Sequence, residues 1–303
     1  MGNTEHFKNS GWPLLIVLLL TLGFAGGIAV SCSSSGEKEN KKQSEKKGET
    51  QRESNRTAQM NQSNLDEASF TELSSNFVSR VINGLSVDKH LDIFKNANPD
   101  SLDDALDTPR KRLTFWINIY NGYTQYFLKT DPSLYKKNRN EFFSKAQIPI
   151  AGYDVSMENV EHGVLRKGST IWSKGYVRVR AFREDFVQQF AVETVDYRIH
   201  FALNCGAKSC PPVVVYEADS VAEQLNENTS YYLNKEVEYN KEKDVVKVPA
   251  LMNWFSADFG GSDEEKRAIL KEYDVIPQDV SPKVAYLPYD WTVKIENYKS
   301  YDI

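Results

Sequence analysis

The sequence predicts an α+β domain in which N-terminal helices pack on a small, mainly antiparallel sheet. Segments with the apolar spacing of helices come first along the chain, and short Val-rich or aromatic segments typical of strands come later. No internal repeat or coiled-coil pattern interrupts this order. Hydrophobic residues make up 40% and charged residues 26% of the 303 residues, as in ordinary globular proteins. The part of the chain that follows the N-terminal region is long enough for one full hydrophobic core.

The N-terminal region contains an apolar run over residues 12–30 that ends in small residues just before Cys32. One interpretation is a retained transmembrane helix, since 19 residues just span the hydrocarbon core. The other is a secretory signal, because AVSC resembles a bacterial lipoprotein processing box with Cys32 as the lipidated residue. The lipoprotein interpretation predicts a leader over residues 1–31. Both interpretations predict a membrane-anchored, extracytoplasmic domain of the bacterial cell envelope.

Residues 32–63 are almost free of apolar side chains and show no periodicity. Such a segment cannot bury enough surface to offset its chain entropy, so we expect a disordered polar tether. The remaining residues 64–303 are then a single globular domain. The net charge of −5 argues against nucleic acid as a partner. The N-terminal lipid or helix predicts the membrane as a partner, and a protein or small-molecule partner stays open.

Three helices are predicted in the first part of this domain. Ser69 and Glu72 form a capping box ahead of a helix over residues 70–82, which Asn83-Gly84 ends. Thr108-Pro109 is an N-cap followed by proline, and it begins a central, largely apolar helix that runs to about residue 129. Ser156 caps a third helix, MENVEHGVLR.

The later elements are mostly strands. Residues 197–203 alternate between apolar and polar side chains, which indicates a half-buried strand. Residues 219–233 are predicted as a helix, and residues 244–249 and 283–287 as short strands.

The segment HFALNCGAKSCPP carries the most reactive side chains of the chain. It places Cys205 in a loop of small residues at the end of a predicted strand, where scaffolds commonly display functional groups. Lys208 would favour the thiolate, and backbone amides around Gly206 would form an oxyanion site. Cys205 is therefore a candidate nucleophile.

A nucleophilic thiol needs a base, and His162 is the candidate that the predicted third helix offers. Glu158 lies one helical turn before it and would fix its tautomer, and Asn118 is an alternative orienting group. His200 is a base only if the chain turns after Asn204, because a continuing strand would point His200 and Cys205 to opposite faces.

Structural interpretations of the same residues remain open. With Cys32 lipidated, two cysteines remain, and an oxidising compartment favours a Cys205–Cys210 disulfide. Their spacing matches no standard zinc pattern, so no metal or other cofactor is predicted. Buried amides at Asn118 and Asn121 bond readily to backbone. Asp258 and Asp290 are each expected either to cap a helix or to pair with a buried arginine, Arg166 or Arg198.

The segments FWINIYNGY, VEHGVLR and DYRIHFALNCGAKSCPP together resemble the bacterial and plant domain-of-unknown-function 547 family, and VPALMNWFSADFG and YLPYDWTV agree. The activity of that family is not established, so the resemblance implies one domain and marks motif positions without assigning roles. The positions that match are Asn118, Asn121, Glu161, His162, Arg166, His200, Asn204, Cys205, Ser209 and Cys210.

Two functions follow as expectations. The first is a thiol-dependent hydrolase or acyl-transfer enzyme with Cys205 as nucleophile and His162 as base. The second is a non-catalytic envelope binding or scaffold domain whose loop is locked by a Cys205–Cys210 bridge. Besides the candidate catalytic groups, the residues expected to contact a ligand are His200, Asn121, Asn204, Arg166 and Ser209.

Overall fold

The computed structural model describes residues 65, 68–178 and 184–299. The described residues belong to one compact unit. The predicted leader (1–31), the candidate lipidation site Cys32 and the predicted tether (32–63) lie outside the described residues. Of the helices in the described part of the chain, none has the length and apolarity needed to cross a membrane.

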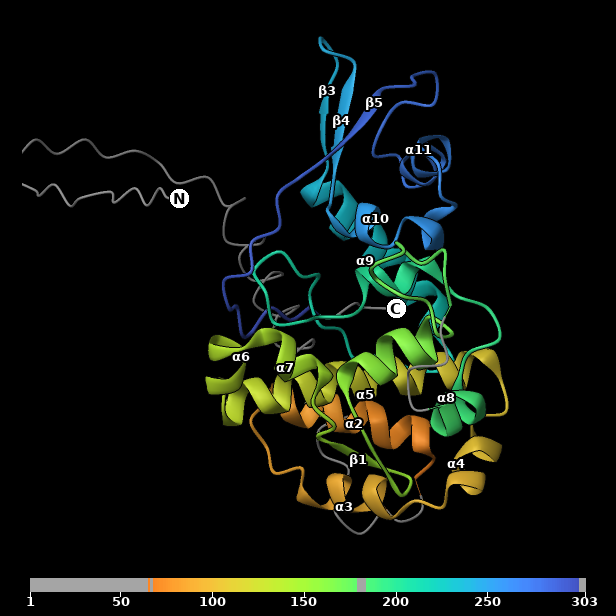
Figure 1. The fold of residues 1–303 in the computed structure, drawn as a ribbon, viewed down its shortest axis with the longest axis vertical. Coiled ribbons are helices and arrows are strands. Elements are labelled where there is room, and N and C mark those ends of the chain that lie inside the picture. Colours follow the sequence, from red (N-terminus) through yellow and green to blue (C-terminus); the bar gives the residue numbers. More distant parts are fainter. Residues whose placement is uncertain (1–64, 66–67, 179–183, 300–303) are drawn as a thin grey trace, which may run out of the picture. The chain divides into compact units, whose positions relative to one another are not determined.

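Two long helices, α2 (Phe70–Ile82) and α5 (Pro109–Thr130), pack along each other in the helical part of the domain (Figure 1). The predicted capping box is present, because Ser69 accepts from the amide of Glu72 and the Glu72 carboxylate accepts from the amide of Ser69. Thr108 caps α5 as predicted. The middle of α5 is buried on all sides, which confirms its expected central position.

Shorter elements surround this pair. The strands β1 (Ile148–Ile150) and β2 (Tyr153–Val155) form an antiparallel hairpin with Ile148 opposite Val155. The short helices are α3 (Asp88–Asn96), α4 (Pro99–Ala105), α6 (Ser133–Lys137), α7 (Arg139–Ser144) and α8 (Glu184–Phe190).

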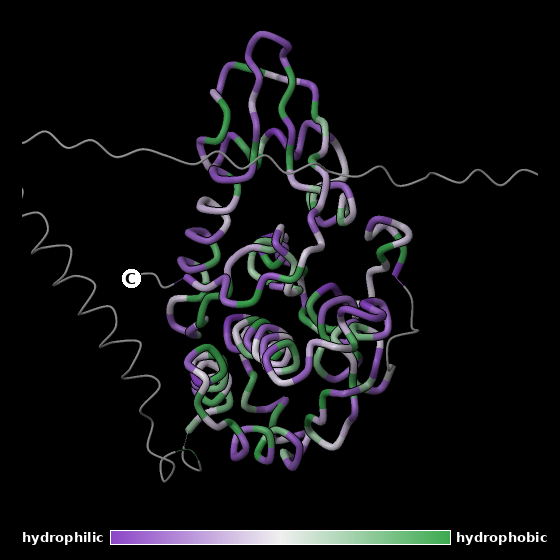
Figure 2. Tube along the Cα trace, turned by 90° about the vertical axis from the view of Figure 1, so that its left-hand side faces the viewer, coloured by the Kyte–Doolittle hydropathy of each residue, from purple (hydrophilic) through white to green (hydrophobic). Residues whose placement is uncertain are grey.

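The C-terminal half holds a second sheet, in the order β3-β4-β5. Its strands β4 and β5 confirm the two predicted strands, and β5 pairs with β4 in parallel while β3 is antiparallel to β4. The turn between β3 and β4 is hydrophilic and exposed (Figure 2). The elements of this half are α9 (Val221–Glu236), β3 (Glu238–Asn240), β4 (Val245–Val248), α10 (Leu251–Trp254), η3 (Ser256–Phe259), α11 (Asp263–Glu272) and β5 (Lys283–Tyr286).

The fold class α+β is thus confirmed, with the strands divided between two small sheets. Each sheet packs into its own apolar cluster. The larger cluster joins α2, α5, β1 and β2, and the smaller joins α9, α10, α11, β4 and β5.

The third predicted helix is present as η1 (Asn159–Leu165), but it is a π-helix. Ser156 caps the α-helical turn at residues 157–158 that leads into η1, since its hydroxyl accepts from the amide of Asn159 over 3.1 Å. Single π-helical turns are frequent at functional sites.

The predicted strand over residues 197–203 is wrong. The chain forms the 3-10 helix η2 (Tyr197–Phe201) instead, begun by Asp196, whose carboxylate accepts from the amide of Arg198 over 3.0 Å. Ile199, His200 and Phe201 are all buried, so the alternation of residue types does not correspond to two faces of a strand. A segment buried on every side shows no usable periodicity.

Candidate functional site

A cavity of about 320 Å³ opens between η1, η2 and the segment that follows β5. Four of the candidate residues line it: Glu158, His162, His200 and Cys205. The turn after η2 brings His200 and Cys205 to the same cavity, although a strand would have separated them.

Cys205 lies in the wall of this cavity, and the buried Cys210 lies beside it. The backbone amide of Cys205 donates to Cys210 Sγ over 3.1 Å, and the Tyr289 hydroxyl is 3.2 Å from Cys205 Sγ and 3.1 Å from Cys210 Sγ. Both cysteines are free, Cys205 partly exposed and Cys210 buried. The disulfide between them stays a prediction.

The environment separates the acidities of the two thiols. Hydrogen bonds from Cys210, from Tyr289 and from the Ala207 amide lower the pKa of Cys205 against the opposing effect of burial. Burial raises the pKa of Cys210 well above its usual value. Cys205 is therefore the thiol that ionises more readily. Lys208 has no part in this, because it pairs at the surface with Asp290 over 3.1 Å.

The loop that carries Cys205 is held by buried amides. Asn204 donates to the carbonyl of Pro211 over 2.6 Å and accepts from the amide of Gly206 over 2.8 Å. Asn121 in turn accepts from the amide of Asn204 over 2.9 Å. Gly206 has a φ of +81°, and a Cβ there would lie 2.3 Å from Leu128 Cδ1, so only glycine fits.

Several predicted site residues therefore act on the backbone and do not line the cavity. The Asn118 side chain donates to the backbone carbonyl of Tyr216 over 2.8 Å and accepts from the backbone amide of Tyr216 over 3.1 Å. Ser209 accepts from the amide of Asp290 over 2.9 Å. Asn118, Asn121, Asn204 and Ser209 hold the loops in place, as buried amides and hydroxyls commonly do.

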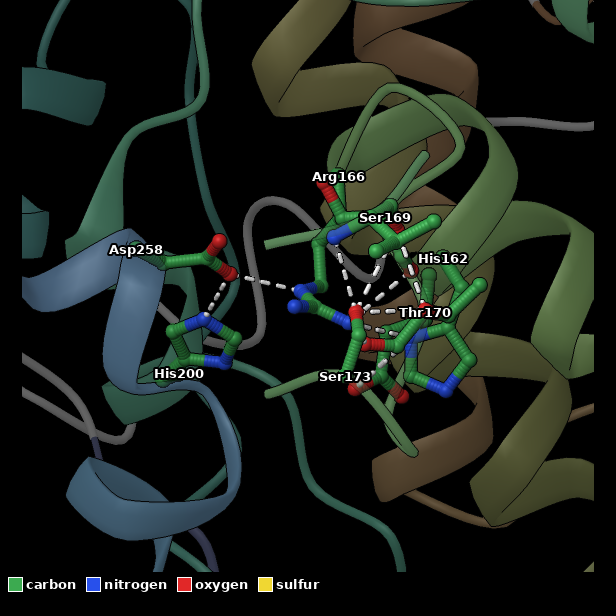
Figure 3. A network of polar contacts seen from close by, with 9 residues as sticks. His162, Arg166, Ser169, Thr170, Ser173, His200 and Asp258 are labelled. Atoms are coloured by element: carbon green, nitrogen blue, oxygen red, sulfur yellow. Dashed lines mark hydrogen bonds and ion pairs between the residues drawn. The ribbon is translucent and has the colours of Figure 1, made fainter. Parts of the chain in front are cut away.

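A buried ionic network joins the two histidines (Figure 3). Asp258 accepts from Arg166 Nε over 2.6 Å and bonds His200 Nε2 over 2.8 Å. Arg166, which has no solvent-exposed surface, also donates to His162 Nδ1 over 3.1 Å. The expected partner of Asp258 is thus Arg166, whereas Arg198 pairs with Asp196.

The network gives the two histidines different roles. A guanidinium only donates, so His162 Nδ1 accepts and its proton sits on Nε2. Burial, and then Arg166, lower the pKa of His162 to about 3. Burial also lowers the pKa of His200, but its hydrogen bond to Asp258 opposes this. The His200 ring stacks on Phe255 with centroids 4.1 Å apart, which fixes its orientation.

Two carboxyl groups add to the cavity wall. Burial raises the pKa of Glu161, which is hydrogen-bonded to Tyr120 and lies 3.7 Å from His162 Nδ1. Burial and the neighbouring Glu161 raise the pKa of Glu158. Glu158, which was expected to fix the tautomer of His162, lines the cavity. The Nδ1 atom of His162 contacts Arg166.

Sequence reasoning missed the aromatic wall of the cavity. Trp254 lies 4.9 Å from Tyr289 and 5.7 Å from Trp291 between ring centroids, and Arg139 stacks on Trp291 at 3.8 Å. The sequence did contain a signal for the three aromatic residues. Trp254 lies in VPALMNWFSADFG, and Tyr289 and Trp291 lie in YLPYDWTV, two segments that resemble the family. Tyr120 is buried in the larger apolar cluster and also borders the cavity.

Within the described ranges, no group of three or more His, Cys, Asp or Glu side chains is placed to hold a metal ion. The site consists of a thiol pair, a histidine–aspartate pair and an aromatic wall. Such a set can supply a nucleophile, a proton acceptor and an apolar binding surface.

Comparison with curated proteins and with solved structures finds no match. A family comparison does find one, and its range contains α5, η1, η2 and both cysteines. Residues 105–233 of this chain match the family described as "Protein of unknown function, DUF547".

Proposed function

We propose that this protein is a thiol-dependent acyl-transfer enzyme or hydrolase with Cys205 as its nucleophile. The observation that carries the proposal is that Cys205 shares a cavity with His200, whose other side is held by Asp258. A nucleophile beside a base that a third group orients is the general arrangement for covalent catalysis.

The base in this proposal is His200. His162 has a pKa of about 3 and accepts a hydrogen bond from Arg166, so it is a poor proton acceptor near neutral pH. The Nε2 atom of His200 is hydrogen-bonded to Asp258. The Nδ1 atom can therefore exchange a proton with the Cys205 thiol. The assignment of His162 as base is replaced on this ground.

The reaction proceeds in two steps. The Cys205 thiolate attacks the carbonyl carbon of an ester or amide, the C–S bond forms, and the leaving group departs with the proton held by His200. Water or an amine then gives a proton to His200, attacks the thioester and regenerates the thiolate.

The oxyanion of this reaction needs a donor other than the one expected around Gly206. The amide of Gly206 donates to Asn204 and that of Cys205 donates to Cys210 Sγ. The Tyr289 hydroxyl, 3.2 Å from the nucleophilic sulfur, is the better candidate. Its pKa is raised by burial, so it stays protonated as a donor.

The test uses p-nitrophenyl acetate as acyl donor and intact mass to detect the acetyl group, on the full-length chain with Cys32→Ala. We expect acetylation of Cys205 that Cys205→Ser abolishes. His200→Gln should slow it by about 10²–10⁴-fold, the usual loss for a general base. The matched control His162→Gln should slow it far less.

The proposal fails if Cys205→Ser is acetylated as fast as the parent, or if the folded protein reacts no faster than its unfolded form. An equal loss in His162→Gln and His200→Gln would reject His200 as the base. Melting temperatures of all variants show whether a loss of rate reflects unfolding.

A non-catalytic envelope binding domain is the second candidate, and the aromatic wall favours it. Trp254, Tyr289 and Trp291 form an apolar surface beside the two carboxyl groups of raised pKa. Folded protein that leaves Cys205 unacetylated but shows ligand-dependent tryptophan fluorescence would support this candidate instead.

The proposed place of action is the bacterial cell envelope, with the chain anchored through Cys32 or the apolar run 12–30. The support is the leader-like sequence, the lipoprotein-like AVSC box and the polar segment 32–63.

A further inference from the structure

The placement of Cys205 and Cys210 suits a reaction that acyl transfer does not use. Cys205 is partly exposed to the cavity, and Cys210, which is 3% exposed, lies directly behind it. Cys210 Sγ accepts from the amide of Cys205, and the Tyr289 hydroxyl contacts both sulfurs. The outer thiol thus meets a substrate, and the inner thiol is within reach of the outer one.

We propose that Cys205 and Cys210 are the attacking and resolving thiols of a thiol–disulfide exchange reaction, with a small-molecule or peptide disulfide as substrate. The Cys205 thiolate attacks one substrate sulfur, a mixed disulfide forms, and the first substrate thiolate leaves. Cys210 then loses its proton and attacks Cys205 Sγ. The second substrate thiolate leaves, and the protein holds a Cys205–Cys210 disulfide.

The electrons balance in this sequence. The substrate disulfide is reduced to two thiols, and the protein dithiol is oxidised to one disulfide. Another turnover needs a thiol reductant from outside, such as a reduced dithiol. The reaction depends only on the thiol pair and does not rest on the acyl-transfer proposal.

The backbone between the cysteines already favours ring closure. The amide of Cys210 donates to the carbonyl of Ala207 over 3.1 Å, so the intervening loop turns back on itself. Asn204 bonds the carbonyl of Pro211, which ties the residues flanking the two cysteines together. Ring closure therefore needs little movement of the chain.

The environment also sets the order of the thiols. The lowered pKa of Cys205 favours it as attacking thiolate, and the raised pKa of buried Cys210 keeps it protonated until the mixed disulfide forms. The Tyr289 hydroxyl can donate to whichever sulfur carries the negative charge.

The experiment reacts the full-length chain, with Cys32→Ala, reduced and freed of reductant, with the aromatic disulfide dithiobis-nitrobenzoate. The released nitrothiobenzoate is measured by absorbance and the protein by intact mass. We expect two equivalents of nitrothiobenzoate per protein, no adduct, and a Cys205–Cys210 disulfide in the peptide map. Dithiothreitol should restore the dithiol without unfolding.

Variants identify the two roles. Cys210→Ser, with Cys210→Ala as a second choice if the first does not fold, should release one equivalent and keep a stable adduct on Cys205. Cys205→Ser should react at least tenfold more slowly than the parent, because Cys210 is buried.

Three results would overturn the proposal, and the parent protein alone decides each of them. A stable adduct on Cys205 would show that Cys210 does not resolve it. Two adducts would show that the thiols react independently. No reaction of the reduced, folded protein would show that neither thiol meets a disulfide.

Discussion

Arg166 is the residue on which the buried network depends. It has no exposed surface, and it contacts Asp258, His162 and the carbonyl of Ser169. Burying a guanidinium is favourable only when partners compensate its lost hydration. Sequence reasoning gave two possible arginines for Asp258. Only the tertiary structure distinguishes them, because Arg166 and Asp258 are 92 residues apart.

Removing one member of this pair should be costly. We expect Asp258→Asn to lower the free energy of unfolding by about 3–5 kcal/mol, since Arg166 would remain buried without its counter-ion. The matched control is Asp196→Asn, which breaks the more exposed Asp196–Arg198 pair and should cost about 1 kcal/mol or less. Urea unfolding monitored by circular dichroism measures both. Equal costs would contradict the assigned role of the buried pair.

A buried histidine should make the stability depend on pH. His90 bonds Asn76 through Nε2, its Nδ1 is buried without a partner, and burial lowers its pKa to about 4. Below about pH 6.5 the unfolded chain binds a proton that the folded chain refuses until about pH 4. In this window the folded state is therefore destabilised as pH falls, by about 1.4 kcal/mol per pH unit at most.

The variant His90→Gln removes the titrating group, and the glutamine amide still offers a hydrogen-bond donor to Asn76. The slope of unfolding free energy against pH reports the protons taken up on unfolding. Between pH 4 and 6.5 we expect His90→Gln to reduce this uptake by up to one proton. His162 and His200, whose pKa values are also lowered, account for the slope that remains. An unchanged slope from urea titrations at several pH values would show that His90 does not titrate as described.

At the scale of elements, capping signals predicted better than periodicity did. The helices α2 and α5 begin where Ser69 and Thr108 cap them, because a cap is a local hydrogen bond. The alternation over residues 197–203 did not predict the structure correctly, because Ile199, His200 and Phe201 of η2 are all buried and do not separate into two faces. The π-turns of η1 also have no signature in the sequence, although Ser156 marked the helical turn that leads into η1.

The contact between α2 and α5 should be sensitive to a single methyl group. A Cβ at Gly122 would lie 2.4 Å from Phe77 Cε1. Helix propensity alone would favour Gly122→Ala by about 1 kcal/mol, but overpacking costs about 1–3 kcal/mol. We expect a net loss of about 1 kcal/mol, measured by urea unfolding.

Phe77→Leu provides the control for this clash. In a double-mutant cycle, Gly122→Ala should cost less in the Phe77→Leu background than in the parent, with a coupling of about 0.5 kcal/mol or more. Strictly additive costs would show that the ring does not oppose the new methyl group.

At the scale of the whole molecule, two apolar clusters flank the cavity that holds the thiols. Cys205 lies in the loop that follows η2, and Phe255 and Tyr289 line the same cavity from segments later in the chain. The site is therefore complete only when the C-terminal half has folded onto α5 and η1.

The proposed tether also belongs to this scale. We expect wild-type protein extracted from membranes to lack residues 1–31 and to carry lipid on Cys32. Cys32→Ala should retain the leader and carry no lipid, and intact mass distinguishes the two. A wild-type mass that includes residues 1–31 would instead identify the apolar run as a retained helix.

The sequence by itself determined the class of the fold, the capped helices, two strands of the second sheet and the segment that carries the thiols, because these follow from local hydrogen bonds and local apolar patterns. It also marked most residues of the buried network as motif positions. The tertiary structure decided which histidine faces which partner, which amides only hold loops, and which aromatic residues form the cavity wall. These contacts join residues far apart in the chain, and only packing brings them together.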